Sequence, residues 1–338
     1  MHRPKLTFPL LCCLGGIVLV FLLHVGLGGT VRLSPSEILA ELFRGPTGGE
    51  SMANSILWDI RLPRSIAAIL AGGVLGAIGT AFQSFFRNAL AEPYVVGVSS
   101  GAGLFGTIAL ISGAGLAMNG LLVPMVATIG GMLSLGLVML IGWSKGRLDV
   151  LRLLIGGIVV GQILSACMTV ILLASGEDTN QVLRWLMGSL TPMDFQQVIV
   201  LAVALIISKV LLGFTARQLN VIAVDHVLAE RLGINVKKLS FWVLGLGACA
   251  VSLVVGTVGI IGLVGLVAPH IARSWLGADT RKVWPIATSI GAMLLGLADL
   301  AAQRIIPSAE LPVGAVTAIV GAPILIWILR RPMMKLVV

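Results

Sequence analysis

The sequence consists of long apolar blocks separated by short polar segments, and this pattern constrains the fold more than any other feature. A helix rises about 1.5 Å per residue, so about 20 apolar residues cross the hydrocarbon core of a membrane. Hydrophobic residues make up 57% of the chain and charged residues only 11%, which is too little charge for a soluble surface. The alternative is a very apolar soluble α/β protein. In such a protein apolar and polar residues would alternate, whereas here the apolar residues form long blocks. We therefore predict an all-α membrane protein.

Blocks of this length predict about ten transmembrane helices in one domain that covers residues 1–338. The first block resembles a signal peptide, but no A-x-A-like cleavage site follows its long apolar stretch, so we expect it to be retained as a span. The eighth block is short and is interrupted by Pro269. The predicted spans are Phe8–Gly28, Pro63–Phe85, Tyr94–Gly113, Leu121–Trp143, Val150–Ala174, Phe195–Phe214, Leu239–Thr257, Ile260–Leu276, Trp284–Ala302 and Leu311–Leu329.

The positions of the basic residues predict the orientation, because cytoplasmic loops of membrane proteins carry an excess of Lys and Arg. With the amino terminus inside, 16 of the 23 Lys and Arg residues fall in inner segments and 6 in outer segments, with Lys209 inside a span. We therefore expect both termini in the cytoplasm, and we attribute the net charge of +9 to topology and not to nucleic-acid binding. The inner residues include Arg3, Lys5, Lys145, Arg331 and Lys335, and the outer ones are Arg32, Arg44, Arg61, Arg64, Arg184 and Arg304.

Two connections between spans are too long for simple turns. The outer connection, Gly29–Leu62, contains a helix-like stretch that Ser34 or Ser36 would cap. The inner connection, Thr215–Lys238, has apolar residues at helical spacing over Val221–Gly233, and a glycine ends this stretch as a C-cap would. We expect a short amphipathic helix at Val221–Gly233, lying flat on the cytoplasmic side of the membrane.

The motifs of common enzymes and metal proteins are missing. The sequence has no G-x-x-x-x-G-K-[ST] phosphate loop, so the chain alone does not hydrolyse ATP. The four histidines are scattered, and the four cysteines lie within apolar blocks and lack the spacing of metal ligands. We therefore expect no catalytic residue, no metal site, no disulfide framework and no cofactor bound by this chain.

Asp299 is the one clear acidic residue inside a predicted span. Ion-coupled carriers place ionisable groups near the membrane midplane, at a cost of about 2.5–3.5 kcal/mol each. The interior of the other spans offers weakly polar side chains instead. This pattern disfavours an ion-coupled secondary transporter, a membrane enzyme and a purely structural subunit. It indicates that any transport is powered by a partner.

Six motifs occur in an order and spacing that resemble one family over essentially the whole chain. They are RLPR at Arg61–Arg64, NALAEP at Asn88–Pro93 followed by GVSSGA at Gly97–Ala102, WLMGSL at Trp185–Leu190, AERLG at Ala229–Gly233, GIIGLVGLVAPHIAR at Gly259–Arg273, and ELPVG at Glu310–Gly314. The chain resembles the permease subunits of type II (FecCD-type) ABC importers, which bring iron-siderophores, haem and cobalamin into bacteria.

The resemblance implies a set of partners and a location. Members have ten helices per subunit and work as two permease subunits with two cytoplasmic ABC ATPases, which bind ATP and Mg²⁺, and with a soluble binding protein outside. We therefore expect a homodimer in the bacterial cytoplasmic (inner) membrane, with a pseudo-heterodimer left open. The expected cargo is an iron-siderophore or a related metal chelate, with haem or cobalamin as alternatives.

The family also implies docking charges for the binding protein at the outer mouth, on Arg61, Arg64 and Arg304. The family often has an arginine four residues after the aspartate that matches Asp299, and here this position is Gln303, followed by Arg304. A helical neighbour points about 100° away, which leaves the role of Arg304 open. The alternative for Arg61 and Arg64 is that they are ordinary arginines reaching to the membrane interface.

The resemblance makes Val221–Gly233 the coupling helix that sits in a groove of the ATPase, and a helix resting on lipid is the alternative. The family usually has Gly-Glu where this chain has Asp225-His226, so the acidic contact is displaced by one residue. The residues expected to contact the ATPase are Asp225, His226, Ala229, Glu230, Leu232 and Gly233.

The resemblance places the fifth span, Val150–Ala174, beside the translocation path at the interface between the two permease subunits. On its own, the G-x-x-x-G pattern in this span indicates only close helix packing. Small, weakly polar and methionine side chains suit a bulky ligand that must pass without tight binding. The expected path residues, whose helix face the sequence leaves open, are Gln162, Ser165, Met168 and Thr169.

Overall fold

The computed structural model describes residues 7–29, 31–46, 51–113, 118, 120–144, 147–176, 179–306 and 310–330. In this part of the chain each predicted span contains a helix, and seven helices are long and apolar enough to cross a membrane. The helices in the predicted spans are α1 (Thr7–Leu27), α4 (Leu62–Phe85), α5 (Val98–Ile111), α6 (Leu122–Gly142), α7 (Val150–Ala174), α9 (Phe195–Val224), α11 (Val236–Val258), α12 (Val264–Leu276), α13 (Thr280–Arg304) and α14 (Val313–Arg330).

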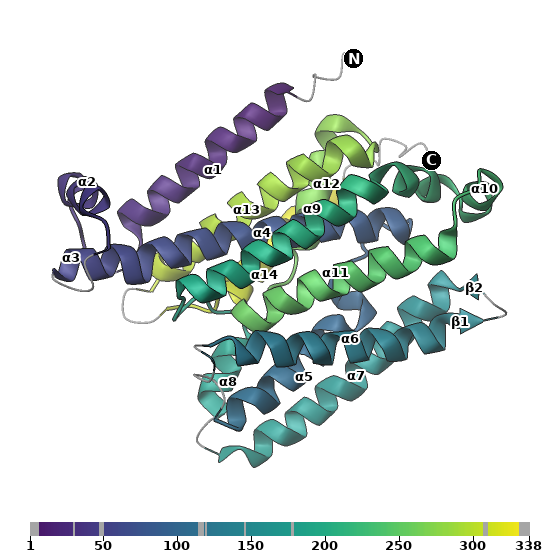
Figure 1. Cartoon of the computed structure of the whole chain (residues 1–338), viewed down its shortest axis with the longest axis horizontal. Coiled ribbons are helices and arrows are strands. Elements are labelled where there is room, and N and C mark those ends of the chain that lie inside the picture. The colour runs from purple at the N-terminus through teal and green to yellow at the C-terminus, as the bar shows by residue number, and fades with distance from the viewer. Residues whose placement is uncertain are drawn as a thin grey trace.

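The elements outside these helices gather at two opposite ends of the bundle (Figure 1). One end carries α2 (Pro35–Arg44), α3 (Met52–Ser55) and α8 (Thr179–Leu186). The other carries α10 (His226–Arg231) and a short antiparallel pair of strands, β1 (Trp143–Ser144) and β2 (Arg147–Leu148). The first end corresponds to the predicted outer side and the second to the predicted inner side.

Which end faces the cytoplasm stays a prediction. Five of the basic residues that we assign to the inner side lie outside the described residues, namely Arg3, Lys5, Lys145, Arg331 and Lys335. The predicted helix start in the outer connection is confirmed. Ser34 caps α2, since its side chain accepts a hydrogen bond from the backbone N–H of Glu37, whose carboxylate in turn accepts from the Ser34 N–H at 2.7 Å.

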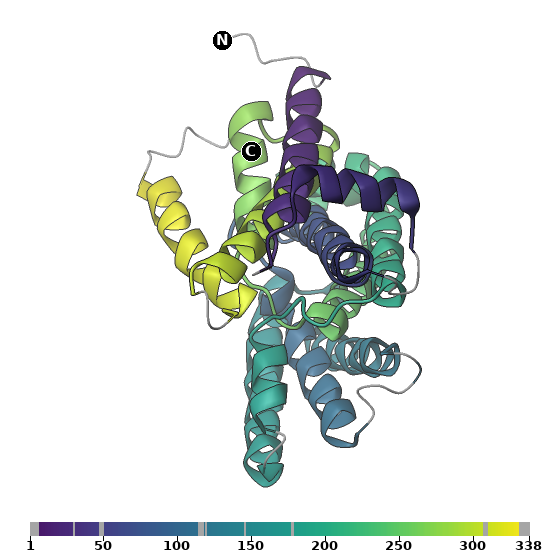
Figure 2. The same ribbon diagram turned by 90° about the vertical axis from the view of Figure 1, so that its left-hand side faces the viewer.

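Helix α4 is the centre of the bundle and packs against α13, α9, α12 and α11 (Figure 2). In its most apolar stretch 83% of the residues are buried, compared with 17% in α7 at the side of the molecule. Without a hydrophobic driving force between helices in lipid, small residues permit the close packing that holds helices together. A Cβ atom added at Gly79 would lie only 1.9 Å from the carbonyl oxygen of Gly265, so the backbones of α4 and α12 nearly touch there.

The third and eighth predicted spans are shorter helices than the sequence indicates. The third begins with a 3₁₀ turn, η2 (Pro93–Val96), and the left-handed Gly97 (φ 75°) separates η2 from α5. The eighth begins with a non-helical segment, and α12 starts only after Leu263, which has a φ of 68°. The 13 residues of α12 span about 20 Å, less than the hydrocarbon thickness of about 30 Å.

The backbone N–H and C=O groups at these helix breaks form hydrogen bonds with other non-helical segments. Tyr94 in η2 donates its hydroxyl proton to the carbonyl of Ile261, and the Ile261 N–H donates back to the Tyr94 oxygen at 3.2 Å. The Val313 N–H donates to the carbonyl of Gly188 at 2.9 Å. Non-helical backbone is tolerated at membrane depth only where protein satisfies it in this way. Four of the six sequence motifs therefore meet at these breaks.

We expect Gly79→Ala to destabilise the protein by about 1–3 kcal/mol, because the added methyl group forces α4 and α12 apart. Thermal unfolding of the detergent-purified protein, followed by size-exclusion chromatography, measures the effect. The control is Gly213→Ala in α9, where nothing lies within 4 Å of the added Cβ. Equal stability of the two variants would show that the contact between α4 and α12 is not limiting.

Candidate functional site

The predicted coupling segment is divided by a break at Asp225. Residues 221–224 continue α9, and Asp225 adopts an extended conformation (φ −163°, ψ 136°) and caps α10 by accepting a hydrogen bond from the Leu228 N–H at 2.9 Å. The predicted helix therefore starts five residues later, at His226. Gly233 (φ 81°) ends it as expected, since the N–H groups of Gly233 and Ile234 return to the carbonyls of Glu230 and Ala229.

Helix α10 packs mainly against α9, and two side-chain contacts link it to the end of α4. The imidazole of His226, the first residue of α10, lies edge-on to the ring of Phe85, with the ring centroids 5.9 Å apart. The carboxylate of Asp225 lies 3.7 Å from the guanidinium of Arg87. Burial, with a smaller contribution from Arg87, lowers the pKa of His226, so its ring is neutral at pH 7. The backbone N–H of Leu228 lowers the pKa of the capping Asp225 carboxyl, which stays ionised.

The opposite face of α10 is open. Ala229 is fully buried, whereas Val227 and Leu228 are exposed and Leu232 is 63% exposed. Glu230 also lies on the surface. This mixture of apolar side chains and a carboxylate on a helix that projects from the bundle is suited to a groove on another protein.

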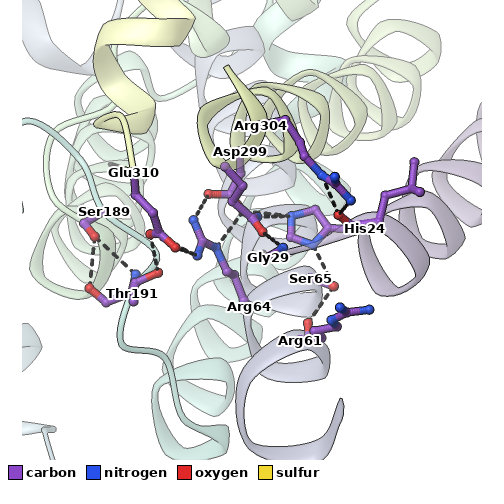
Figure 3. Close-up of polar contacts among 12 residues, drawn as sticks. His24, Gly29, Arg61, Arg64, Ser65, Ser189, Thr191, Asp299, Arg304 and Glu310 are labelled. Atoms are coloured by element: carbon purple, nitrogen blue, oxygen red, sulfur yellow. Dashed lines mark hydrogen bonds and ion pairs between the residues drawn. The ribbon is translucent and has the colours of Figure 1, made fainter. Parts of the chain in front are cut away.

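At the other end of the bundle Arg64 belongs to a buried polar cluster (Figure 3). Its guanidinium donates to both carboxylate oxygens of Asp299, at 2.9 and 3.0 Å, and to Glu310 at 3.0 Å. Asp299 is fully buried and also contacts the imidazole of His24 at 2.7 Å and accepts from the amide of Gln303 at 2.8 Å. Bidentate pairing of arginine with a carboxylate is a strong and directional interaction.

The other two arginines of the predicted rim bind carbonyl groups at the end of α1 and in the segment just after it. Arg61 is 3% exposed and donates to the carbonyls of Val25, at 2.7 Å, and Val31. Arg304 donates to the carbonyl of Leu27 at 2.7 Å and remains exposed. A guanidinium at a helix C-terminus satisfies carbonyls that have no partner within the helix. Of the three predicted docking residues, only Arg304 presents an accessible side chain.

The predicted path residues fall on two faces of α7. Ser165 and Met168 face α5, where the Ser165 hydroxyl lies 3.4 Å from that of Ser100 and Met168 lies beside Gly103. Gln162 and Thr169 are exposed on the outer face. Because α7 is mostly uncovered in the single chain, its exposed face is available to a second subunit.

A model of the FecCD transport family matches residues 16–331. The chain belongs to this family. It is therefore a multi-pass membrane protein and the permease of an ABC importer, a class in which a partner subunit carries the ATPase. Among the residues that the structure describes, this permease has no group of three or more His, Cys, Asp or Glu side chains that could hold a metal ion.

Two curated relatives align with most of the permease. The vitamin B12 import system permease protein BtuC of Escherichia coli O157:H7 is 35% identical over 325 residues, which cover 95% of this chain and 94% of BtuC. The uncharacterized ABC transporter permease protein YvrB of Bacillus subtilis is 33% identical over 292 residues, which cover 86% of this chain and 83% of YvrB.

Two solved structures resemble the permease. An inward-facing conformation of a putative metal-chelate type ABC transporter matches with a TM-score of 0.82 and 28% identity, over 97% of this chain and 100% of that chain. The PsaBC structure from Streptococcus pneumoniae, solved in complex with a Fab, matches with a TM-score of 0.54 and 16% identity, over 86% of this chain and 95% of that chain. The second similarity shows only that the fold is shared.

Sequence reasoning missed the cluster around Arg64 in this FecCD permease. It singled out Asp299 as an acid inside a span and Gln303 as a departure from the family, and the spacing of four residues places both on one helix face. It had no signal for His24, and although Glu310 opens the ELPVG motif, nothing in the sequence paired it with Arg64.

We expect Asp299→Asn to destabilise the permease by about 3–5 kcal/mol, because it leaves the Arg64 guanidinium buried without its bidentate partner. Thermal unfolding in detergent measures the change, with the exposed Asp59→Asn as the control. The double variant Arg64→Gln/Asp299→Asn should lose less stability than the sum of the two single changes. Strictly additive losses would contradict a direct coupling between the two side chains.

Proposed function

We propose that this chain forms a dimeric membrane channel that receives a metal chelate from an extracytoplasmic binding protein and releases it into the cytoplasm, driven by two ABC ATPases. The observation that carries the proposal is the match of 97% of the chain to a transporter described as metal-chelate type, at a TM-score of 0.82. The open face of α10 and the exposed face of α7 supply surfaces for the ATPase and for a second permease.

Cobalamin is the cargo that the relatives favour, because a vitamin B12 import permease shares 35% identity over almost the whole chain. The sequence alone favoured an iron-siderophore, and this remains the second candidate, with haem as the third. Among the residues that the structure describes, no side chain distinguishes the three cargoes. In an importer of this kind selection is made largely by the binding protein.

The proposed mechanism is alternating access. Helix α10 contacts the end of α4 through His226 and Phe85, and the start of α4 carries Arg64 at the opposite end of the bundle. The 24 residues of α4 measure about 36 Å, so a tilt imposed at α10 moves the side chains around Arg64. ATP binding would close the ATPases on the two α10 helices and open the outer mouth, and hydrolysis would reset it.

The test of the function is uptake into proteoliposomes that contain the permease with its cognate ATPase and binding protein. Cyanocobalamin, a ferric siderophore and haem are offered separately, with ATP inside. Accumulation of one of them that requires ATP supports the proposal. Accumulation by the permease alone, driven by an ion gradient, would overturn it.

We expect Leu232→Asp to abolish copurification of the ATPase and to abolish uptake, because it places a charge on the open apolar face beside α10. The matched control is Leu39→Asp, which changes a leucine of similar exposure, 56% compared with 63%, on α2 at the other end of the bundle. If both variants retain the ATPase, the coupling surface lies elsewhere.

We expect Arg304→Glu to weaken binding of the cognate binding protein about two- to fivefold, with the difference fading at high salt, as for an exposed ion pair. Arg44→Glu is the control, since Arg44 is an exposed arginine at the same end of the bundle. Biolayer interferometry on the permease in nanodiscs measures both. An unchanged affinity for Arg304→Glu would remove this residue from the docking surface.

A further inference from the structure

A groove of about 540 Å³ lies between α9 and α11, at the end of the bundle that carries α10. Phe214 of α9 is 81% exposed and Trp242 of α11 is 50% exposed on its walls. We propose that this groove is a binding site for one anionic glycerophospholipid of the inner leaflet, with its phosphate at Lys238 and one acyl chain between Phe214 and Trp242.

The two walls share one gradient of polarity. Helices α9 and α11 run in opposite directions, so Gln218 lies level with Asn235 and Lys238 near α10, and Val210 lies level with Leu246 deeper in the bundle. The amide and ammonium groups thus gather at one end and the aliphatic side chains at the other. From Val210 to Gln218 the groove extends about 12 Å along the helix axis. A head group followed by an acyl chain has the same order of polarity.

The charge at the polar end selects an anionic head group. Among the described residues no carboxylate forms an ion pair with Lys238. The neighbouring Lys237 points elsewhere, with its ammonium group 4.7 Å from the centroid of the Trp143 ring. Lys238 is therefore the ammonium group available to a phosphate in the groove, and basic residues next to a span attract anionic lipid.

The position of the groove in the bundle favours a lipid as its occupant over a protein partner. Most of the groove is lined by residues of α9 and α11, two helices that are long and apolar enough to cross a membrane. Its aromatic walls lie beside the polar end, and tryptophan is enriched at this level of membrane proteins because its ring is amphipathic. An ATPase seated on α10 would leave the deeper, apolar part of the groove to lipid.

The experiment uses the purified full-length chain in nanodiscs that contain a fixed fraction of lipid brominated on its acyl chains, which quenches tryptophan fluorescence on contact. The quenching that belongs to Trp242 is the difference in quenched fluorescence between the wild type and Trp242→Phe. We expect brominated phosphatidylglycerol to occupy the site about fivefold better than brominated phosphatidylcholine, as one lysine at a lipid surface provides. Lys238→Gln should abolish this preference.

The control is Lys237→Gln, which removes the same charge from the adjacent position outside the groove and should keep the preference. Equal quenching of Trp242 by both lipids would show non-selective lipid contact only and would overturn the proposal. The same loss in Lys237→Gln as in Lys238→Gln would also overturn it, since the effect would then be one of general surface charge. Absence of quenching by either lipid would show that something other than lipid fills the groove.

Discussion

The close approach of α4 to its neighbours is the constraint on which the rest of the molecule depends. In lipid, helices gain little from burying apolar side chains, so association depends on packing of backbones that small residues bring close together. Gly72, Gly76 and Gly79 lie against the backbones of α13 and α12, so that α4 is surrounded by other helices. A helix enclosed in this way cannot bend independently, and it links the two ends of the bundle.

The same closeness explains where the polar groups lie. Asp299 is enclosed by protein, where an isolated carboxylate would be costly, and it is accepted because Arg64, His24 and Gln303 surround it. The cluster ties α1, α4 and α13 together at one end of the bundle. Glu310, which is half exposed and precedes α14, joins it through Arg64. Arg61 and Arg64 of the RLPR motif therefore stabilise the single chain. To bind a docking protein, they would have to give up their present hydrogen-bond partners.

The sequence predicts the helices well because about 20 apolar residues are required to cross a membrane whatever their packing. It predicts local features equally well, as with the Ser34 cap of α2 and the glycine that ends α10. It fails at the third and eighth spans, because the breaks at Gly97 and Leu263 are joined by contacts between distant segments, such as the hydrogen bond from Tyr94 to the carbonyl of Ile261. The cluster around Arg64 could not be predicted for the same reason, since contacting members such as His24 and Asp299 are 275 residues apart.

The position of α10 explains what Asp225 and His226 do where the family usually has Gly-Glu. Asp225 ends α9 and caps α10, and it lies beside Arg87, just past the end of α4, while His226 lies against Phe85 within α4. His226 therefore packs against the bundle, whereas the Asp225 carboxylate, whose side chain is 44% exposed, stays accessible beside the exposed Leu228 and Leu232. The residues at 225 and 226 thus supply the side-chain contacts between α10 and the end of α4. An ATPase that binds here, as we propose, would meet Asp225 together with this exposed face.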